Sequence, residues 1–116
     1  MIKVAIIGAG WAGKKHAEVY NKLDTAKIDC IIDEKLESAT KLAKQYNVAK
    51  VYSNYKELLN KNLDLVDICT PTATHENMTL DLATNVKYIL LEKPMARTRE
   101  DCEKIIEACK RNDVKL

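Results

Sequence analysis

The glycines of this 116-residue chain are its first candidates for chemistry. The three of them, Gly8, Gly10 and Gly13, form the pattern G-x-G-x-x-G directly after an apolar run that ends at Ile7. Between a strand and a helix, this spacing gives a tight turn, room for a pyrophosphate against the backbone, and close helix packing. The free N–H groups at the helix start would bind the phosphates. The alternative is a tight turn that holds no ligand.

A carboxylate lies at the distance from this turn at which a ribose-binding acidic residue is expected. Asp33 ends a second apolar run about 20 residues after Gly13, where an acidic side chain accepts hydrogen bonds from the hydroxyls of an adenosine ribose. Its negative charge would repel a 2′-phosphate, so we expect NAD to be preferred, with NADP possible. Glu34 adds to this repulsion, whereas Lys35 opposes it. Alternatively, Asp33 caps the helix that follows.

The only two prolines mark two further candidate corners. Around Pro71, the hydroxyls and backbone amides of Thr70 and Thr72 would hold the second ribose or the nicotinamide side of a dinucleotide. His75 either belongs to this site or is an exposed residue of the next helix. At Pro94, the preceding Lys93 is either a general acid or base beside a nicotinamide or an ordinary surface lysine.

Metal ligation is not indicated. The four cysteines show no C-x-x-C spacing, and the two histidines are not spaced as co-ligands. We expect His16 to be a hydrogen-bonded packing residue. We expect four small buried hydrophobic side chains, reduced in the cytoplasm, at Cys30, Cys69, Cys102 and Cys109.

Apolar periodicity predicts alternating strands and helices. We expect strands over 1–7, 27–33, 51–52, 65–70 and 86–91, and helices over 11–23, 36–46, 53–59, 75–84 and from 98 onward. Such alternation predicts right-handed βαβ units, and hence one α/β domain over 1–116 with a doubly wound parallel sheet of the Rossmann type. The glycines and prolines then lie beyond the carboxyl ends of strands, where open α/β sheets bind ligands.

Some details of the helices are also predicted. In the first helix, Ala12, Val19, Tyr20 and Leu23 are expected to share the buried face. Ser53 should cap the short third helix, and Thr98 should open the last one with a capping box. The buried face of that last helix should hold Cys102, Ile105, Ile106 and Cys109.

The composition excludes several classes of partner. The chain is 47% hydrophobic and 31% charged, with a net charge of +2 and interspersed Lys and Glu, so it lacks the basic face of a nucleic-acid-binding domain. No apolar run is long enough for a membrane span, and no signal peptide pattern is present. We therefore expect a cytoplasmic domain that binds neither nucleic acid nor a membrane.

Three segments together resemble the N-terminal NAD(P)-binding domain of the Gfo/Idh/MocA oxidoreductases, the glucose–fructose oxidoreductase and inositol dehydrogenase relatives. They are residues 4–17, 67–75 and 91–94, the last of which contains Glu-Lys-Pro. The resemblance implies hydride transfer between a nicotinamide cofactor and a sugar- or polyol-type alcohol. It implies that Lys93 is the catalytic lysine beside the nicotinamide, that Glu92 lines the cofactor pocket, and that residues 70–75 contact the cofactor. In the turn, Trp11 and Ala12 would also contact it.

The chain departs from this family in its length. Family members continue into a second α/β domain that supplies the substrate pocket and further proton-transfer residues. This chain stops where a sixth strand is expected to begin, so we expect a fragment that lacks the substrate domain and binds the cofactor without turnover. A stand-alone nucleotide-sensing or partner-binding module is the alternative. Coenzyme A as the ligand is a third hypothesis, which the Glu92-Lys93-Pro94 corner argues against. No oligomeric state is indicated.

Overall fold

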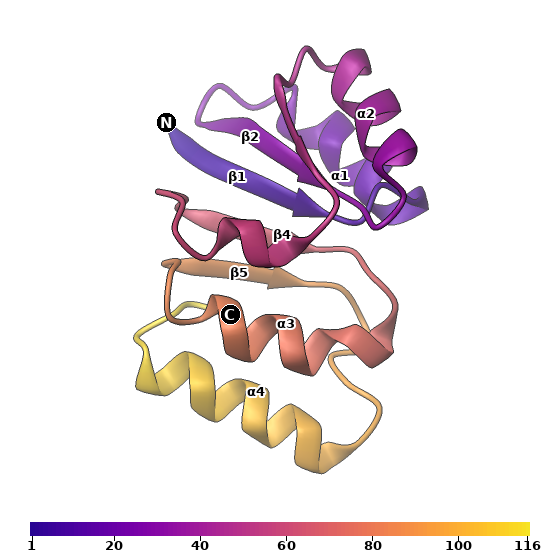
Figure 1. The fold of residues 1–116 in the computed structure, drawn as a ribbon. Helices are drawn as coiled ribbons and strands as arrows, with labels where there is room; N and C mark the ends of the chain where they lie inside the picture. Colours follow the sequence, from indigo (N-terminus) through magenta and orange to yellow (C-terminus); the bar gives the residue numbers. More distant parts are fainter.

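The computed structural model describes residues 1–116. A single parallel sheet forms its centre (Figure 1). Its order is β3-β2-β1-β4-β5, and each neighbouring pair is parallel. This is the doubly wound Rossmann arrangement that the sequence predicts. The strands are β1 (Ile2–Ile7), β2 (Ala26–Ile32), β3 (Lys50–Tyr52), β4 (Leu65–Ile68) and β5 (Tyr88–Leu91).

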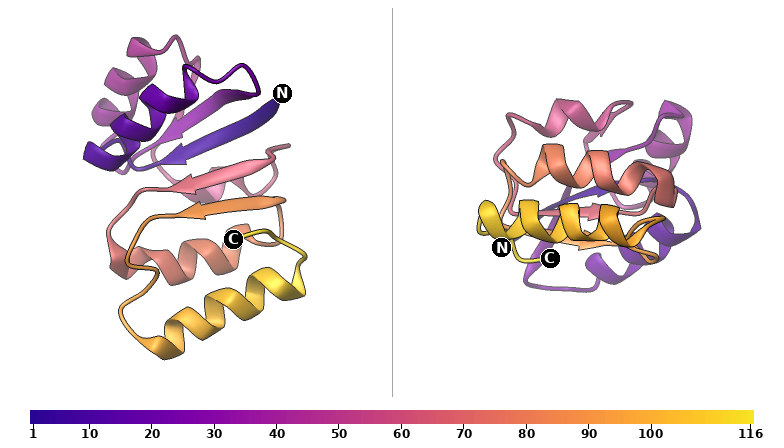
Figure 2. Two further views of the ribbon diagram at one scale, coloured as in Figure 1. Left: turned by 180° about the vertical axis from the view of Figure 1, so that it is seen from behind. Right: turned by 90° about the horizontal axis from the view of Figure 1, so that it is seen from below.

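Helices cover both faces of the sheet (Figures 1 and 2). On one face lie α1 (Trp11–Tyr20) and α2 (Leu36–Gln45). On the other lie the short 3₁₀ helix η1 (Tyr55–Leu58) and α3 (His75–Leu82), which follows the 3₁₀ turn η2 (Thr72–Thr74). The last helix, α4 (Arg99–Arg111), packs along α3 beside β5. No helix has the length and apolar character needed to cross a membrane.

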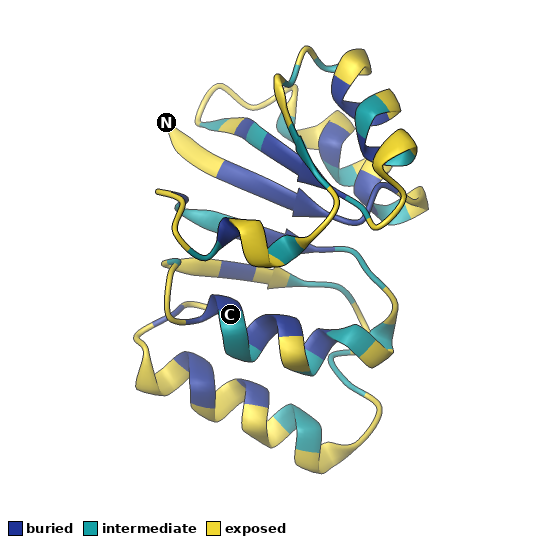
Figure 3. Cartoon of the chain, in the orientation of Figure 1, coloured by how far each residue is buried: buried dark blue, intermediate teal, exposed yellow.

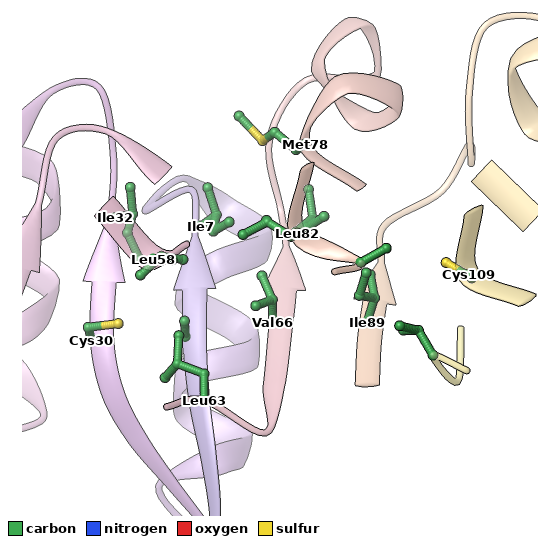
Figure 4. Packing of buried hydrophobic residues seen from close by; sticks show 14 residues of the cluster. Ile7, Cys30, Ile32, Leu58, Leu63, Val66, Met78, Leu82, Ile89 and Cys109 are labelled. Carbon is green, nitrogen blue, oxygen red and sulfur yellow. The ribbon is translucent and has the colours of Figure 1, made fainter. Parts of the chain in front are cut away.

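The central strand β1 contributes to two hydrophobic cores at once. Val4 and Ile6 pack under α1 and α2, whereas Ala5 and Ile7 pack with Leu82 of α3 on the opposite face (Figure 4). Because side chains alternate along a strand, a strand covered on both faces must be apolar throughout. Figure 3 shows this burial along the middle strands. The continuous apolar run before the glycine turn is therefore explained.

The buried face of α1 differs from the expected one. The helix ends at Tyr20, and Val19 and Leu23 are 56% and 45% exposed. Its fully buried residues are Gly13 and Ala17, whose small size lets the helix lie close to the sheet. Tyr20 is partly buried and packs against the core as expected. The expectation is wrong for Val19 and Leu23, because the contact with the sheet requires small residues.

Helix caps account for two further boundaries. Asn54, not Ser53, caps η1, because its side chain accepts a hydrogen bond from the N–H of Lys56 at 3.0 Å. Thr98 caps α4 as predicted, since its hydroxyl accepts the N–H of Asp101 at 3.1 Å. The reciprocal bond of the expected capping box, from the Thr98 N–H to the Asp101 side chain, is not formed.

The cysteines are buried to different degrees. Cys30 and Cys109 are buried, whereas Cys69 and Cys102 are partly exposed, and all four are free thiols. The expectation of four buried side chains is therefore wrong for two. In α4 the buried face is completed by Ala108, while the predicted Ile106 is exposed.

The last residues of the chain lie along the edge of β5. Lys115 forms a parallel bridge with Tyr88, and its carbonyl oxygen accepts the N–H of Ile89 at 2.9 Å. The end of the chain thus lies beside β5, where a sixth strand of the sheet was expected to begin (Figure 2).

Candidate functional site

A cavity of about 890 Å³ opens at the carboxyl ends of the strands. It lies where the turn after β1 meets the end of β4, the point at which the strand order reverses and open α/β sheets bind ligands. Five of the residues that the sequence selects line this cavity, namely Gly8, Gly10, Asp33, Thr70 and Pro71.

The three glycines of the turn have different surroundings. A Cβ atom on Gly8 would stand 2.6 Å from the carbonyl oxygen of Cys69, and Gly8 has a positive φ of +103°. A Cβ on Gly13 would stand 1.8 Å from the carbonyl oxygen of Gly8. A Cβ on Gly10 would meet nothing within 4 Å. Two glycines are thus required by the fold itself, whereas Gly10 leaves open space at the cavity.

The start of α1 presents free backbone donors to this space. Gly10 is the N-cap of α1, and no side chain caps the helix there. The first N–H groups of a helix lack intrahelical acceptors, and the helix dipole makes this end positive. An anionic group such as a phosphate fits here.

Asp33 connects the end of β2 to the glycine turn. Its Oδ2 accepts the N–H of Ala9 at 2.8 Å, and its Oδ1 accepts the N–H of Lys35 at 2.8 Å. A carboxylate has about four acceptor positions, so two remain for ligand hydroxyls. The alternative that Asp33 caps α2 is wrong, because the N-cap is Lys35 and no side chain caps that helix. The two backbone bonds of Asp33 are compatible with the predicted ribose contact.

The cavity wall includes residues that the sequence analysis missed. Ser53, Asn54 and Tyr55 follow β3 and line the cavity beside Asp33. The sequence could have indicated these three residues, because they directly follow the strand that it predicts over 51–52. Tyr55 also donates a hydrogen bond to Asp81 at 2.7 Å, and burial followed by this bond raises its pKa to about 12.

His75 is not the exposed helix residue of the alternative hypothesis. Its side chain is buried, with 1% of the residue exposed. Its Nε2 lies 2.8 Å from the carbonyl oxygen of Thr70, and its Nδ1 lies 3.1 Å from the carbonyl oxygens of Pro94 and Met95. The ring thus joins the two proline corners of the sheet edge. Direct contact with a cofactor stays a prediction.

His16 also joins two strand ends. Its Nδ1 lies 2.8 Å from Oδ2 of the fully buried Asp67, and its Nε2 lies 3.2 Å from Oε1 of Glu92. The expectation of a hydrogen-bonded histidine is met, but its partners are two carboxylates at the ligand edge rather than a packing surface. Sequence spacing gave no signal for this cluster, since its residues come from three elements.

Cys69 and Tyr20 complete the surroundings of Asp67. The Sγ of Cys69 donates to Oδ1 of Asp67 at 3.2 Å. Burial first, and the Asp67 charge second, raise the pKa of Cys69 and of Tyr20 well above their ordinary values. Ligand atoms of His16, Asp67 and Cys69 lie within 4.8 Å of one another, as in a metal site. Because metal ligation requires a thiolate, a protonated Cys69 fits a hydrogen-bond network better.

The remaining predicted residues do not line the cavity. Trp11, Ala12 and Thr72 lie at the starts of α1 and η2, and Lys93 is exposed at the corner after β5. Glu92 lies at the same corner, where its N–H donates to the carbonyl oxygen of Ile68 at 3.1 Å.

Comparison with known proteins identifies a family with this fold. The model for an oxidoreductase family with an NAD-binding Rossmann fold matches residues 2–116. A myo-inositol 2-dehydrogenase of Thermotoga maritima is 30% identical over 116 residues, which are 99% of this chain and 35% of the relative. A 2,7-anhydro-N-acetylneuraminate hydratase of Escherichia coli is 32% identical over 110 residues, 95% of this chain and 29% of the relative. The chain thus spans about a third of these relatives.

A solved structure has the same fold. The myo-inositol dehydrogenase of Lactobacillus casei in complex with NAD(H) and myo-inositol superposes with a TM-score of 0.87 at 29% identity. The match covers 93% of this chain and 33% of that one.

Proposed function

The chain belongs to the oxidoreductase family with an NAD-binding Rossmann fold, and on that premise we propose that its cavity binds NAD as the cofactor-binding part of a hydride-transferring enzyme. Residues 1–116 would form one dinucleotide-binding domain. The adenosine ribose would lie against Asp33, the pyrophosphate against Gly10, and the nicotinamide toward Thr70 and Lys93. The observation that carries this proposal is the open space at Gly10, between two glycines that the fold itself requires.

Each group at the edge would have a separate task. NAD, when bound, supplies or accepts a hydride at its nicotinamide ring. The N–H groups at the start of α1 would bind the phosphates, and Asp33 would fix the adenosine ribose by its remaining acceptor positions. Lys93 would hold a hydroxyl of the substrate and exchange its proton, which is the work of a general acid or base.

The substrate of the intact protein is proposed to be a sugar- or polyol-type alcohol. The inositol dehydrogenases among the relatives support this class. The cavity accounts for the cofactor alone, and the relatives are about three times as long, so we expect the 116-residue chain to bind NAD without turnover. Four free thiols support a reducing compartment such as the cytoplasm.

Calorimetric titration of the chain with NAD and with NADP tests the proposal. We expect NAD to bind at least about tenfold more tightly, a difference of about 1.4 kcal/mol, because Asp33 repels the 2′-phosphate. In Asp33→Asn this ratio should decrease, since the charge is lost while one acceptor oxygen is kept. Glu34→Gln is the matched control from the same wall and should change the ratio less.

Two results would contradict it. If neither dinucleotide binds at millimolar concentration, the cofactor site itself is wrong. If both bind and Asp33→Asn leaves the ratio unchanged, Asp33 does not select between them.

A further inference from the structure

The ring of His16 lies between two acidic side chains, one within a strand and one just after another strand. Asp67 belongs to β4 and is completely buried, whereas Glu92 follows β5 and its side chain is 30% exposed. The Nδ1 faces the first at 2.8 Å and the Nε2 faces the second at 3.2 Å. Cys69 is the other titratable group beside the ring, with its Sγ 3.4 Å from Nδ1. Tyr20 of the same helix faces Asp67.

The ring of His16 is the basic group in contact with Asp67. This carboxylate is completely buried and has no Lys or Arg partner among the ion pairs. A buried carboxylate requires hydrogen-bond partners, and Nδ1 of His16 at 2.8 Å and Sγ of Cys69 at 3.2 Å contact it. The contact with Asp67 therefore holds the ring in place with its Nε2 directed at Glu92.

The corner that His16 contacts is the one that carries Lys93. On one side of Lys93, Glu92 is held by its N–H bond to the carbonyl oxygen of Ile68 and by its side-chain contact with His16. On the other side, the carbonyl oxygen of Pro94 accepts from the His75 ring at 3.1 Å. Lys93 itself forms no ion pair or side-chain hydrogen bond within the chain. Its location therefore depends on its two neighbours.

We propose that His16 is a positioning residue: its ring bridges Asp67 and Glu92 and thereby fixes the corner that presents Lys93 to the nicotinamide. The part that concerns the nicotinamide rests on the proposed function. The bridge itself is a property of the chain without a cofactor.

The first test is the ¹⁵N spectrum of the histidine rings in the labelled chain at neutral pH. The chain has only two histidines, so the ring signals are assigned by comparison with His16→Asn. We expect Glu92→Gln to shift the Nε2 signal of His16 and to leave its Nδ1 signal nearly unchanged, because Glu92 contacts Nε2 and Asp67 contacts Nδ1. An Nε2 signal that Glu92→Gln leaves unchanged overturns the proposal.

The second test separates the two contacts of the ring. Asn at position 16 is too short to reach Glu92 but retains a side-chain amide near the place of Nδ1, so Asp67 keeps a donor. We expect the amides of Glu92, Lys93 and Met95 to exchange about threefold to tenfold faster in His16→Asn, a modest change because the Glu92 contact is partly exposed. Amides within α1 should not change, whereas loss of packing alone would change them.

Glu18→Gln is the control on the same helix, because Glu18 pairs only with the exposed Lys15 and Lys22. It should leave the corner amides unchanged. Unchanged corner amides in His16→Asn would overturn the proposal.

A third readout uses NAD itself. In the unmodified chain we expect a nuclear Overhauser effect between the nicotinamide ring protons and the Lys93 side chain. In His16→Asn this effect should disappear, while NAD affinity stays within about threefold because the phosphate and ribose contacts are intact. An effect of unchanged strength overturns the positioning role. Absence of NAD binding in the unmodified chain contradicts the proposed function instead, and the ring spectrum and corner amides still decide on the bridge.

Discussion

The glycines in the turn after β1 have different roles, which single substitutions can distinguish. Gly13 has no room for a Cβ, because the carbonyl oxygen of Gly8 would lie 1.8 Å away. Gly10 has room, and its backbone, at φ −78° and ψ −160°, is one that alanine adopts. The fold thus requires Gly13, whereas Gly10 matters only if a ligand approaches it.

We therefore expect Gly13→Ala to lower the free energy of unfolding by about 3 kcal/mol or more. Gly10→Ala should change it by less than about 0.5 kcal/mol and yet weaken NAD binding at least about tenfold. Urea denaturation and calorimetry measure the two quantities. Equal NAD affinity in Gly10→Ala and the unmodified chain would show that no phosphate lies at this glycine.

Site residues were predictable from the sequence where chemistry follows a local pattern. The turn at Gly8 and the carboxylate of Asp33 each stand at a set distance from a strand end, and both line the cavity. The pairing of His16 with Asp67 and Glu92 has no such pattern, because it depends on how three elements meet. An aspartate within an apolar strand, as at Asp67, was the available signal that a buried partner exists.

Strands and helices were predicted well where burial requires a continuous or periodic apolar pattern, and less well at their ends. All five expected strands are present, but β4 ends at Ile68 and the first helix ends at Tyr20. A single hydrogen bond from a capping side chain often determines where a helix begins. Ser53 and Asn54 are both good capping residues, so the sequence alone did not show which of them caps η1.

The cap of α4 gives a measurable contribution. Thr98→Ala removes the acceptor for the N–H of Asp101, so the free energy of unfolding should fall by about 1 kcal/mol. Thr40→Ala is the control, because Thr40 lies inside α2 and its exposed hydroxyl donates only to the carbonyl oxygen of Leu36. It should be neutral or slightly stabilising. A cap variant as stable as the control would remove Thr98 from this role.

Across the whole molecule, the alternation of elements predicted the parallel Rossmann sheet, but it did not predict which residues of neighbouring strand ends meet. The placement of β4 beside β1 brings Cys69 against Gly8 and creates the cavity. No local sequence pattern predicts the contact between Cys69 and Gly8, because these residues lie about 60 positions apart. The contact follows from the reversal of strand order that is general in open α/β sheets.

Burial of thiols in this core makes the fold sensitive to alkali. Burial first, and then the charge of Asp29, raise the pKa of Cys30 to about 12. Between the ordinary thiol pKa of about 8.5 and this value, the unfolded chain loses the proton and the folded chain keeps it, so stability falls as pH rises. Cys69, Cys109 and Tyr20 act in the same direction.

Cys30→Ala should therefore flatten the decline of the unfolding free energy between about pH 9 and pH 11, by up to about 1.4 kcal/mol per pH unit. Urea denaturation across this range gives the slope. Ile31→Val, which shortens a buried neighbour in the same strand without a titratable group, should keep the original slope. An equal slope in both variants would contradict the role of the Cys30 proton.

Trp11, the first residue of α1, can report cofactor binding by its fluorescence. Trp11 is the only tryptophan, it is 78% exposed, and it directly follows Gly10. Reduced nicotinamide absorbs light where indole emits, so bound NADH should quench Trp11 fluorescence by energy transfer and emit in its place. In Gly10→Ala the NADH concentration that gives half of this quenching should rise at least about tenfold. Unchanged emission of the unmodified chain at saturating NADH would contradict the prediction. Because there is only one donor indole, each change in emission can be assigned to the turn.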